Sequence, residues 1–278
     1  MNVLKAALLA AALVSASGST SAAVTCSFGT IGGINITNYV EGVASNQAAT
    51  INVSCTRTAN GDPNPVTYTV TFDTGSYNNR ALATVSGTNY YITYSKAATT
   101  GCTPAVTSVS GVLNWPTSGN SKGTQSGSVN YAGCVAAQTG LAAATYTDSI
   151  GLTLSNNAAA GTTSGSAAVS IAVPAQCTFS TPPGAINFNY TALRASPLVA
   201  TTTFGTTCTR TAPYTLSLDT TTGAVAGLAY SLSLSGSSGT GSGTEQTYTI
   251  TGTMAAGQPG DCTGSCSGSN NHTVTVSY

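Results

Sequence analysis

The pentapeptide Cys55-Thr56-Arg57-Thr58-Ala59 returns unchanged as Cys208-Thr209-Arg210-Thr211-Ala212. Another cysteine precedes each copy at nearly the same distance, Cys26 in the first case and Cys177 in the second. Internal repetition at this scale, in a chain of 278 residues, indicates a duplicated domain. The repeat therefore predicts two copies of one fold.

The similarity continues beyond the pentapeptide. Tyr-Thr-Val-Thr-Phe-Asp at 68–73 corresponds to Tyr-Thr-Leu-Ser-Leu-Asp at 214–219, and both copies end in alternating apolar residues. A period of two is typical of strands with one buried face, and turn-rich connections favour antiparallel pairing. We therefore predict an all-β chain of two tandem immunoglobulin-like sandwiches. The expected strands lie near residues 26–37, 49–55, 66–73, 88–95, 127–133 and 146–154, and near 177–190, 201–208, 213–219, 228–235, 247–253 and 272–278.

Composition limits the function. Charged residues make up 5% of the chain and its formal net charge is zero, so it offers no basic surface for nucleic acid or anionic lipid. Thirteen tyrosines and many threonines favour strands, whereas the abundant glycine, serine and asparagine favour turns. We expect no nucleic-acid partner and no cofactor.

The N-terminus has the order of a secretory signal peptide. Lys5 precedes an apolar stretch over 6–14, and small residues follow up to Ala23. Cleavage after Ala16 and cleavage after Ala23 both fit, and residues 1–23 are the predicted signal. No later segment approaches the roughly 20 apolar residues of a transmembrane helix. The chain is therefore expected to be exported.

Eight cysteines in an exported chain favour disulfides over metal thiolates. The repeat pairs Cys26 with Cys55 and Cys177 with Cys208. It does not assign the other four cysteines, which pair by elimination as Cys102–Cys134 and Cys262–Cys266.

An enzyme is not expected. The single histidine, His272, lies at the start of the last strand with no Gly-x-Ser-x-Gly elbow in the chain, so we expect an outward-facing side chain. A metal site at Cys262, Cys266 and His272 lacks a fourth ligand. Asp73 and Asp219 recur at matching strand ends, which indicates hydrogen bonding in turns.

With these residues in view, the chain resembles the spore coat protein U domain family, which includes the pilins of archaic chaperone–usher pili. The motifs are Cys-Thr-Phe at 177–179, the second Cys-Thr, Tyr-Thr-Leu-Ser-Leu at 214–218, Met-Ala-Ala-Gly-Gln at 254–258 and the closing Thr-Val-Thr-Val-Ser-Tyr at 273–278. The resemblance implies a sandwich that lacks its seventh strand. It also implies a periplasmic chaperone, an outer-membrane usher and a neighbouring pilin as partners, and the cell-surface pilus as destination. The strand ending in Val274, Val276 and Tyr278 would be the edge that receives the chaperone or donor strand.

A donor strand is expected just before a domain's first cysteine. Val169, Ile171 and Val173 alternate before Cys177, whereas the matching positions before Cys26 are Gly18, Thr20 and Ala22. We therefore expect 167–173 to turn back through the loop 156–166 and complete the first copy, leaving the second copy open. The alternative is a plain linker. The predicted domains are 24–155 and 177–278, with 156–176 between them.

Accepting a strand without donating one indicates a tip subunit. The connection over 96–126 in the first copy carries apolar residues, of which Val112, Leu113 and Trp115 are candidate contacts for a host or abiotic surface in attachment and biofilm formation. Trp115 is equally interpretable as a plug of the sandwich. The alternatives to a tip adhesin are a minor pilin and a secreted coat or matrix protein that completes its own domains.

Overall fold

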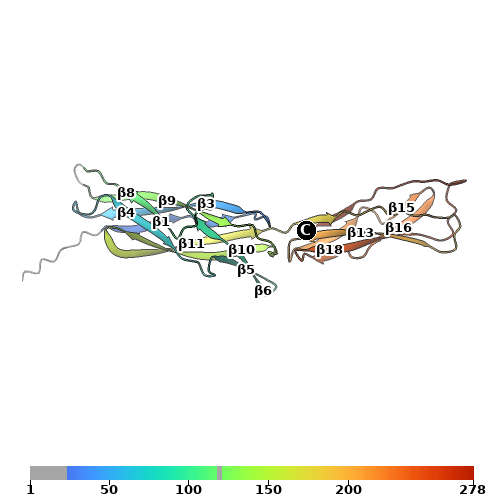
Figure 1. Cartoon of the computed structure of the whole chain (residues 1–278), viewed down its shortest axis with the longest axis horizontal. Coiled ribbons are helices and arrows are strands. Elements are labelled where there is room, and N and C mark those ends of the chain that lie inside the picture. The colour runs from blue at the N-terminus through green and yellow to red at the C-terminus, as the bar shows by residue number, and fades with distance from the viewer. Residues whose placement is uncertain (1–23, 118–120) are drawn as a thin grey trace, which may run out of the picture.

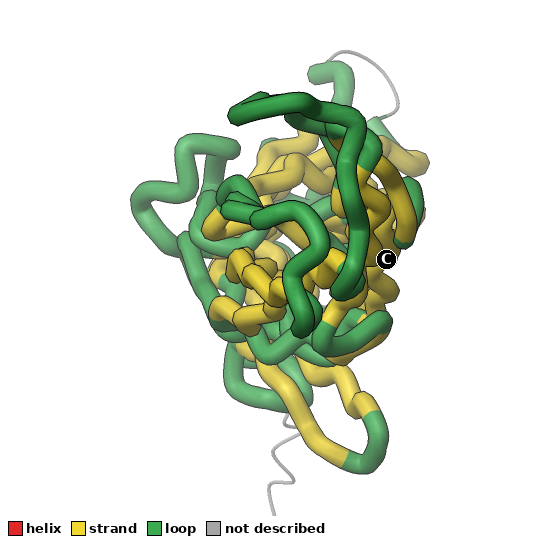
Figure 2. Tube along the Cα trace, turned by 90° about the vertical axis from the view of Figure 1, so that its right-hand side faces the viewer, coloured by secondary structure: helices red, strands yellow, loops and turns green. Residues whose placement is uncertain are grey.

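The computed structural model describes residues 24–117 and 121–278, and the predicted signal peptide lies outside them. The described residues form strands and loops without helices, arranged as two β-sandwiches end to end (Figure 1). Viewed along the long axis from the second sandwich, loops lie in front of the strands (Figure 2). No helix capable of crossing a membrane occurs in the described part of the chain.

The first sandwich packs a four-stranded sheet, in the order β1-β3-β9-β7, on a larger sheet with the order β2-β11-β10-β4-β8. The β5–β6 hairpin joins the larger sheet through β10. The strands are β1 (Thr25–Ile31), β2 (Ile34–Ile36), β3 (Ser45–Arg57), β4 (Val66–Phe72), β5 (Arg80–Val85), β6 (Thr88–Thr93), β7 (Ser95–Ala97), β8 (Ser108–Leu113), β9 (Gly123–Val135), β10 (Ala144–Asn156) and β11 (Ala159–Val173).

The core of the first sandwich follows from the alternation. Alternate residues are buried along β4, along β3 from Ala49 onward and along β10 from Ile150 to Leu154, and their neighbours are mostly threonine and serine that face solvent or pair across strands. Burial of this apolar face is the main stabilising contribution, at roughly 25 cal/mol per Å². The largest fully buried side chains include Tyr39, Tyr68, Tyr131, Tyr146, Ile34, Ile51, Ile92, Ile150, Leu152, Leu154 and Ile171.

Strand β11 occupies the position between β10 and β2. It pairs antiparallel with β10 from Ala144↔Val173 to Leu154↔Thr163, and parallel with β2 from Val169↔Ile34 to Ile171↔Ile36. The expected loop over 156–166 is wrong, because β10 turns tightly into β11, which begins at residue 159. The segment before Cys177 is thus a strand of the first sandwich, and only residues 174–176 connect it to the second.

Three further strands depart from expectation. The region 96–126 contains β8, which pairs with β4, and the additional strands β5 and β7 precede it. β8 was missed because Gly111 interrupts its apolar pattern. The glycine is required there, since a Cβ would lie 2.4 Å from the Tyr68 ring.

The second sandwich has sheets with the orders β12-β13-β18-β16-β15 and β17-β14-β19. Its first strand ends at Thr181, well short of the predicted 190. Within the described residues, β19 pairs with β14 and has no strand on its other side. The strands are β12 (Cys177–Thr181), β13 (Leu198–Cys208), β14 (Pro213–Leu218), β15 (Thr222–Val225), β16 (Leu228–Leu234), β17 (Ser238–Thr240), β18 (Glu245–Met254) and β19 (Val274–Ser277).

Four disulfides are present. Cys26–Cys55 and Cys177–Cys208 each join the first strand of a sandwich to its neighbour, at matching places. Cys102–Cys134 ties the chain after β7 to β9, and Cys262–Cys266 closes a small loop before β19. The chain reaches Cys134 from Tyr94 because β7 folds back along β9, where Ser95 pairs with Cys134.

Buried tyrosines predict alkaline unfolding. Burial raises the pKa of Tyr131 and of Tyr146, each to about 12, whereas a tyrosine in the unfolded chain ionises near 10. The folded state therefore keeps protons that the unfolded state loses. The tyrosine contribution to the free energy of unfolding should be fully present below about pH 10 and be lost between about 10 and 12. Denaturant titrations across this range should show the fall, with a shallower slope for Tyr131→Phe; an unchanged stability at pH 12 would contradict it.

Candidate functional site

A groove of about 1370 Å³ opens in the second sandwich. One wall is the segment after β12, with Ile186, Phe188 and Tyr190, and the other is the chain that leads into β19, with His272 and Val274. Leu232, Ile250 and Met254 contribute to its lining from the core. The groove is therefore an extension of the hydrophobic core to the surface.

The two walls correspond to elements that β11 separates in the first sandwich. Tyr39 and Tyr190 make the same bonds: the hydroxyl of each donates to a backbone carbonyl, of Ala136 at 2.8 Å and of Ala255 at 2.7 Å. Each hydroxyl also accepts from a glutamine backbone N–H, of Gln138 and Gln258 respectively. Ile-Asn-Phe at 186–188 precedes Tyr190 as Ile-Asn-Ile at 34–36, the strand β2 that pairs with β11, precedes Tyr39, with one residue fewer between the motif and the tyrosine.

The second wall is fixed by the register with the adjacent strand. Leu152 and Leu154 of β10 lie opposite Phe72 and Val70, whereas Val274 and Val276 of β19 lie opposite Leu218 and Leu216. Asp73 and Asp219 donate their backbone N–H groups to Gly151 and Thr273, which extends the match. His272 thus stands where the first sandwich has Ile150.

The same places differ in burial. Ile34, Ile36, Leu152 and Leu154 are buried, whereas Ile186, Phe188, Val274 and Val276 are half-buried. Tyr278, the third edge residue predicted from the sequence, is 60% exposed. The predicted donor residues Val169, Ile171 and Val173 are all buried in the first sandwich. An unpaired strand beside a partly exposed apolar face is a template for β-augmentation.

His272 does not face outward as expected. Its Nδ1 donates to Asp219 at 3.1 Å, and its Nε2 lies 2.6 Å from the Tyr230 hydroxyl, inside the groove. Asn270 donates to the same hydroxyl. The hydrogen bond from His272 is the main cause that lowers the pKa of the Asp219 carboxyl. The expectation failed because the chain before Val274 is a loop, where alternation assigns no face.

Both ring nitrogens of His272 are occupied by Asp219 and Tyr230, and neither holds a serine or cysteine nucleophile. Asp73 holds the turn after β4, where its carboxylate accepts from Gly75 and Gly151. No group of three or more His, Cys, Asp or Glu side chains suited to a metal occurs among the described residues.

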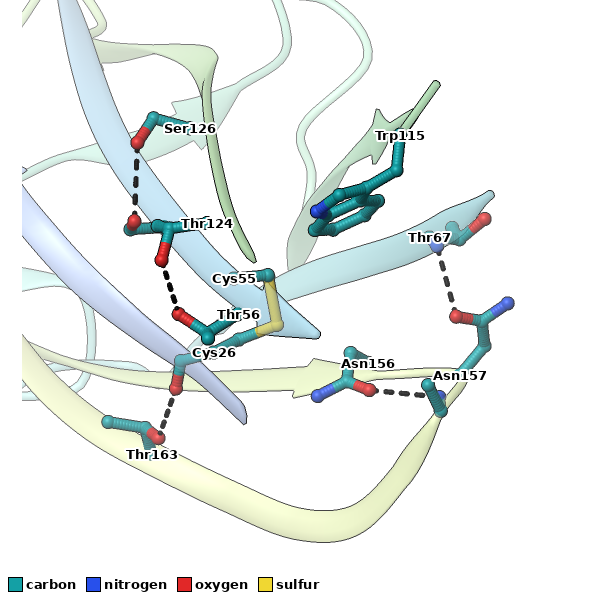
Figure 3. Close-up of a disulfide and its surroundings, with 12 residues drawn as sticks. Cys26, Cys55, Thr56, Thr67, Trp115, Thr124, Ser126, Asn156, Asn157 and Thr163 are labelled. Carbon is teal, nitrogen blue, oxygen red and sulfur yellow. Dashed lines mark hydrogen bonds between the residues drawn. A yellow bond between two sulfur atoms is a disulfide. The ribbon is translucent and has the colours of Figure 1, made fainter. Parts of the chain in front are cut away.

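The predicted surface contact is wrong for Leu113 and Trp115. Leu113 is 6% exposed and Trp115 3% exposed, and both belong to the core. Trp115 lies at the same end of the sandwich as Cys26–Cys55 (Figure 3), where its Nε1 donates to the Gly123 carbonyl. β8 alternates, so Leu113 turns inward and Val112, 54% exposed, turns outward.

Polar groups cover Trp115 at this end of the first sandwich, which is the end that holds the Cys26–Cys55 disulfide. The Arg57 guanidinium lies 5.4 Å from the Trp115 ring centre and donates to the Ser121 carbonyl. The Asn64 amide holds the Trp115 backbone with two hydrogen bonds. The residues that face solvent around this plug are Asn60, Gly61, Pro63, Asn64, Pro65, Pro116, Thr117 and Lys122.

The family model of the Spore Coat Protein U domain matches residues 4–153 and 163–240, well over half of the chain. The chain belongs to the Spore Coat Protein U domain family. No curated protein sequence matches it significantly. Among solved structures, it resembles the chaperone–tip adhesion subunit pre-assembly complex from the archaic chaperone–usher Csu pili of Acinetobacter baumannii. The identity is 15% and the TM-score 0.45, over 91% of this chain and 99% of that chain.

Sequence reasoning missed the hydrogen bonds that Tyr39 and Tyr190 make in this Spore Coat Protein U chain. Asn-Tyr at 38–39 and at 189–190 was a visible repeat, and it lies at the same distance from the first cysteine of each copy. The polar cluster at His272 left no such signal, because its members come from separate loops and strands.

The burial pattern of β8 and of Trp115 just after it predicts different effects for two substitutions in this region. Trp115→Ala removes a buried side chain and should lower the free energy of unfolding by about 3–5 kcal/mol. Val112→Ser, on the outer face, should change it by less than about 0.5 kcal/mol. Denaturant titration of both variants measures this, and a Trp115→Ala protein as stable as the parent would contradict the plug.

Proposed function

We propose that this chain is the tip subunit of a chaperone–usher pilus. Its first sandwich is completed by its own strand β11, and its second accepts a donor strand from the neighbouring subunit. The single observation that carries the proposal is the contrast between the filled position beside β10 and the open groove beside β19. Membership of the Spore Coat Protein U family supports it.

The direction of β11 in the first sandwich predicts the direction of a donor strand in the second. In the first sandwich β11 starts beside the end of β10 and runs back along it. A donor strand on β19 would likewise start near Ser277, at the junction of the sandwiches, where the chain ends (Figure 1). It would leave at the opposite end of the second sandwich, so the neighbouring subunit would continue the line of the molecule.

The first sandwich would then form the free end of the fibre. The positions before Cys26 that correspond to the donor residues are Gly18, Thr20 and Ala22, which offer little apolar side chain to a groove. Surface attachment would use the polar, proline-rich end around Trp115, together with exposed residues such as Val112. A periplasmic chaperone would protect the groove of the second sandwich before assembly at the outer-membrane usher.

A coat or matrix protein that completes its own domains is the second candidate. It accounts for the first sandwich, where β11 is supplied in the same chain. It does not account for the open groove of the second, because a half-buried apolar wall beside an unpaired strand favours aggregation unless something covers it.

Completion within the chain can be tested with fragments. Fragment 24–174 contains β11 and should unfold cooperatively without additions, whereas fragment 24–157 lacks it and should not fold. A synthetic peptide of residues 159–173 should restore folding of the shorter fragment, as followed by circular dichroism. Equal folding of both fragments alone would contradict a structural role for β11.

Acceptance by the second sandwich needs the full chain. A peptide of residues 163–173 should bind with one site per chain, because the first groove is filled. The same peptide with Val169, Ile171 and Val173 replaced by serine should not bind. Val276→Ser in the chain should weaken binding at least tenfold in calorimetry, whereas Thr275→Ser, on the outer face, should not. Equal binding of the original and the serine-substituted peptide would contradict the proposal.

A further inference from the structure

Lys96 is a buried amine that neither the groove nor the polar end uses. It lies on β7 and is 6% exposed. Its Nζ donates to the Asp73 backbone carbonyl at 2.7 Å and to the Asn79 side-chain Oδ1 at 2.5 Å. The ion pair found in the described part of the chain is His272–Asp219, so Lys96 has no carboxylate at salt-bridge distance.

Such a lysine is costly as a cation. A buried ammonium is stabilised when a carboxylate pairs with it, and two neutral acceptors replace its hydration only partly. Burial accordingly lowers the pKa of Lys96, although the charges of Asp73 and Asp148 act in the opposite direction. Burial therefore makes the neutral amine, which is the nucleophilic form, easier to reach than for a lysine in water.

Asn79 is held in place for reaction with this amine. Its backbone lies in the left-handed region, at a φ of 58°, which asparagine tolerates better than most residues. Its N–H donates to Thr74 and its carbonyl accepts from Tyr94, so both sides of the peptide are fixed. With Nζ 2.5 Å from Oδ1, a C=O bond of about 1.2 Å keeps the amide carbon within about 3.7 Å. That limit lies just above the roughly 3–3.5 Å at which groups react, so attack needs a small approach of Nζ toward the carbon.

We propose that Lys96 and Asn79 join in an intramolecular amide bond. The neutral Nζ attacks the amide carbon of Asn79, a C–N bond forms, and the bond from that carbon to Nδ2 breaks. One proton from Nζ passes to Nδ2, which leaves as ammonia, so atoms and charge balance without an oxidant or cofactor. The product removes the buried amine.

Two carboxylates and a tyrosine surround the amine without a salt bridge to it. Asp73 and Asp148 both act electrostatically on Lys96. The Tyr94 ring lies 5.9 Å from Nζ, and its hydroxyl donates to Asp148 at 2.7 Å. Burial raises the pKa of Tyr94, so its hydroxyl stays protonated, and the proton that Lys96 loses to become neutral goes to water.

The bond would close the base of the β5–β6 hairpin. Asn79 precedes β5 and Lys96 follows β6, while a single residue pair, Thr147↔Leu82, joins the hairpin to β10. A covalent tie at the base restricts the unfolded chain as a disulfide does. In the second sandwich, Asp219 matches Asp73 but bonds to His272, so the arrangement belongs to the first sandwich alone.

Peptide mapping of the denatured, reduced full chain tests the bond. Trypsin cuts after Arg57, Arg80, Lys96 and Lys122 in this region. With the bond, cleavage after Lys96 should be lost. Peptides 58–80 and 81–122 should then appear as one species, lighter than their sum by one ammonia. Free peptides 81–96 and 97–122 in the parent protein would overturn the proposal without any variant.

Variants assign the species to these two residues. Lys96→Arg and Asn79→Ala should each abolish the linked species. Asn78→Ala is the matched control, since Asn78 is exposed and has a similar φ of 57° but makes no bond to Lys96. A linked species that persists in Asn79→Ala would also overturn the proposal.

Discussion

The backbone pairing between β10 and β11 is the interaction on which the first sandwich depends. β10 pairs with β4 on one side, so its other side would present a row of unpaired N–H and C=O groups. β11 satisfies that row along nearly its whole length and bonds to β2 beyond it. At the same time its inward side chains complete the core. One strand therefore meets two requirements, hydrogen bonding of the edge and burial of the apolar face.

The second sandwich shows the fold without that strand. The segment that matches β2 is irregular, and β19 is much shorter than β10. The apolar residues on both walls remain half-buried, and the core cluster is correspondingly smaller. A strand that lies between two segments orders both of them, because their backbone N–H and C=O groups then have hydrogen-bond partners. The groove is thus a direct consequence of one missing pairing partner.

The repeated pentapeptide acquires different roles in the two sandwiches. Arg57 is buried beneath loops and lies beside Trp115, whereas the Arg210 side chain is exposed. At the second copy, the backbone instead makes the junction: Arg210 accepts from Ala143 of the first sandwich, and Thr209 donates to Gln176. The same end of the fold is capped by Trp115 and Arg57 in one copy and forms a contact between sandwiches in the other.

The duplication, the strand-rich class and the apolar alternation of Val169, Ile171 and Val173 can be read from the amino-acid pattern. These are local or periodic properties, and a period of two specifies a strand wherever it is paired. The pattern did not determine the inward turn of Leu113 and Trp115, the orientation of His272 or the neighbours of Lys96. Alternation shows that one face is buried but not which partner buries it, and loop residues have no such constraint. These positions depend on contacts between segments far apart in the chain, such as β4 with β8 and β7 with β9, and so they follow from the folded arrangement.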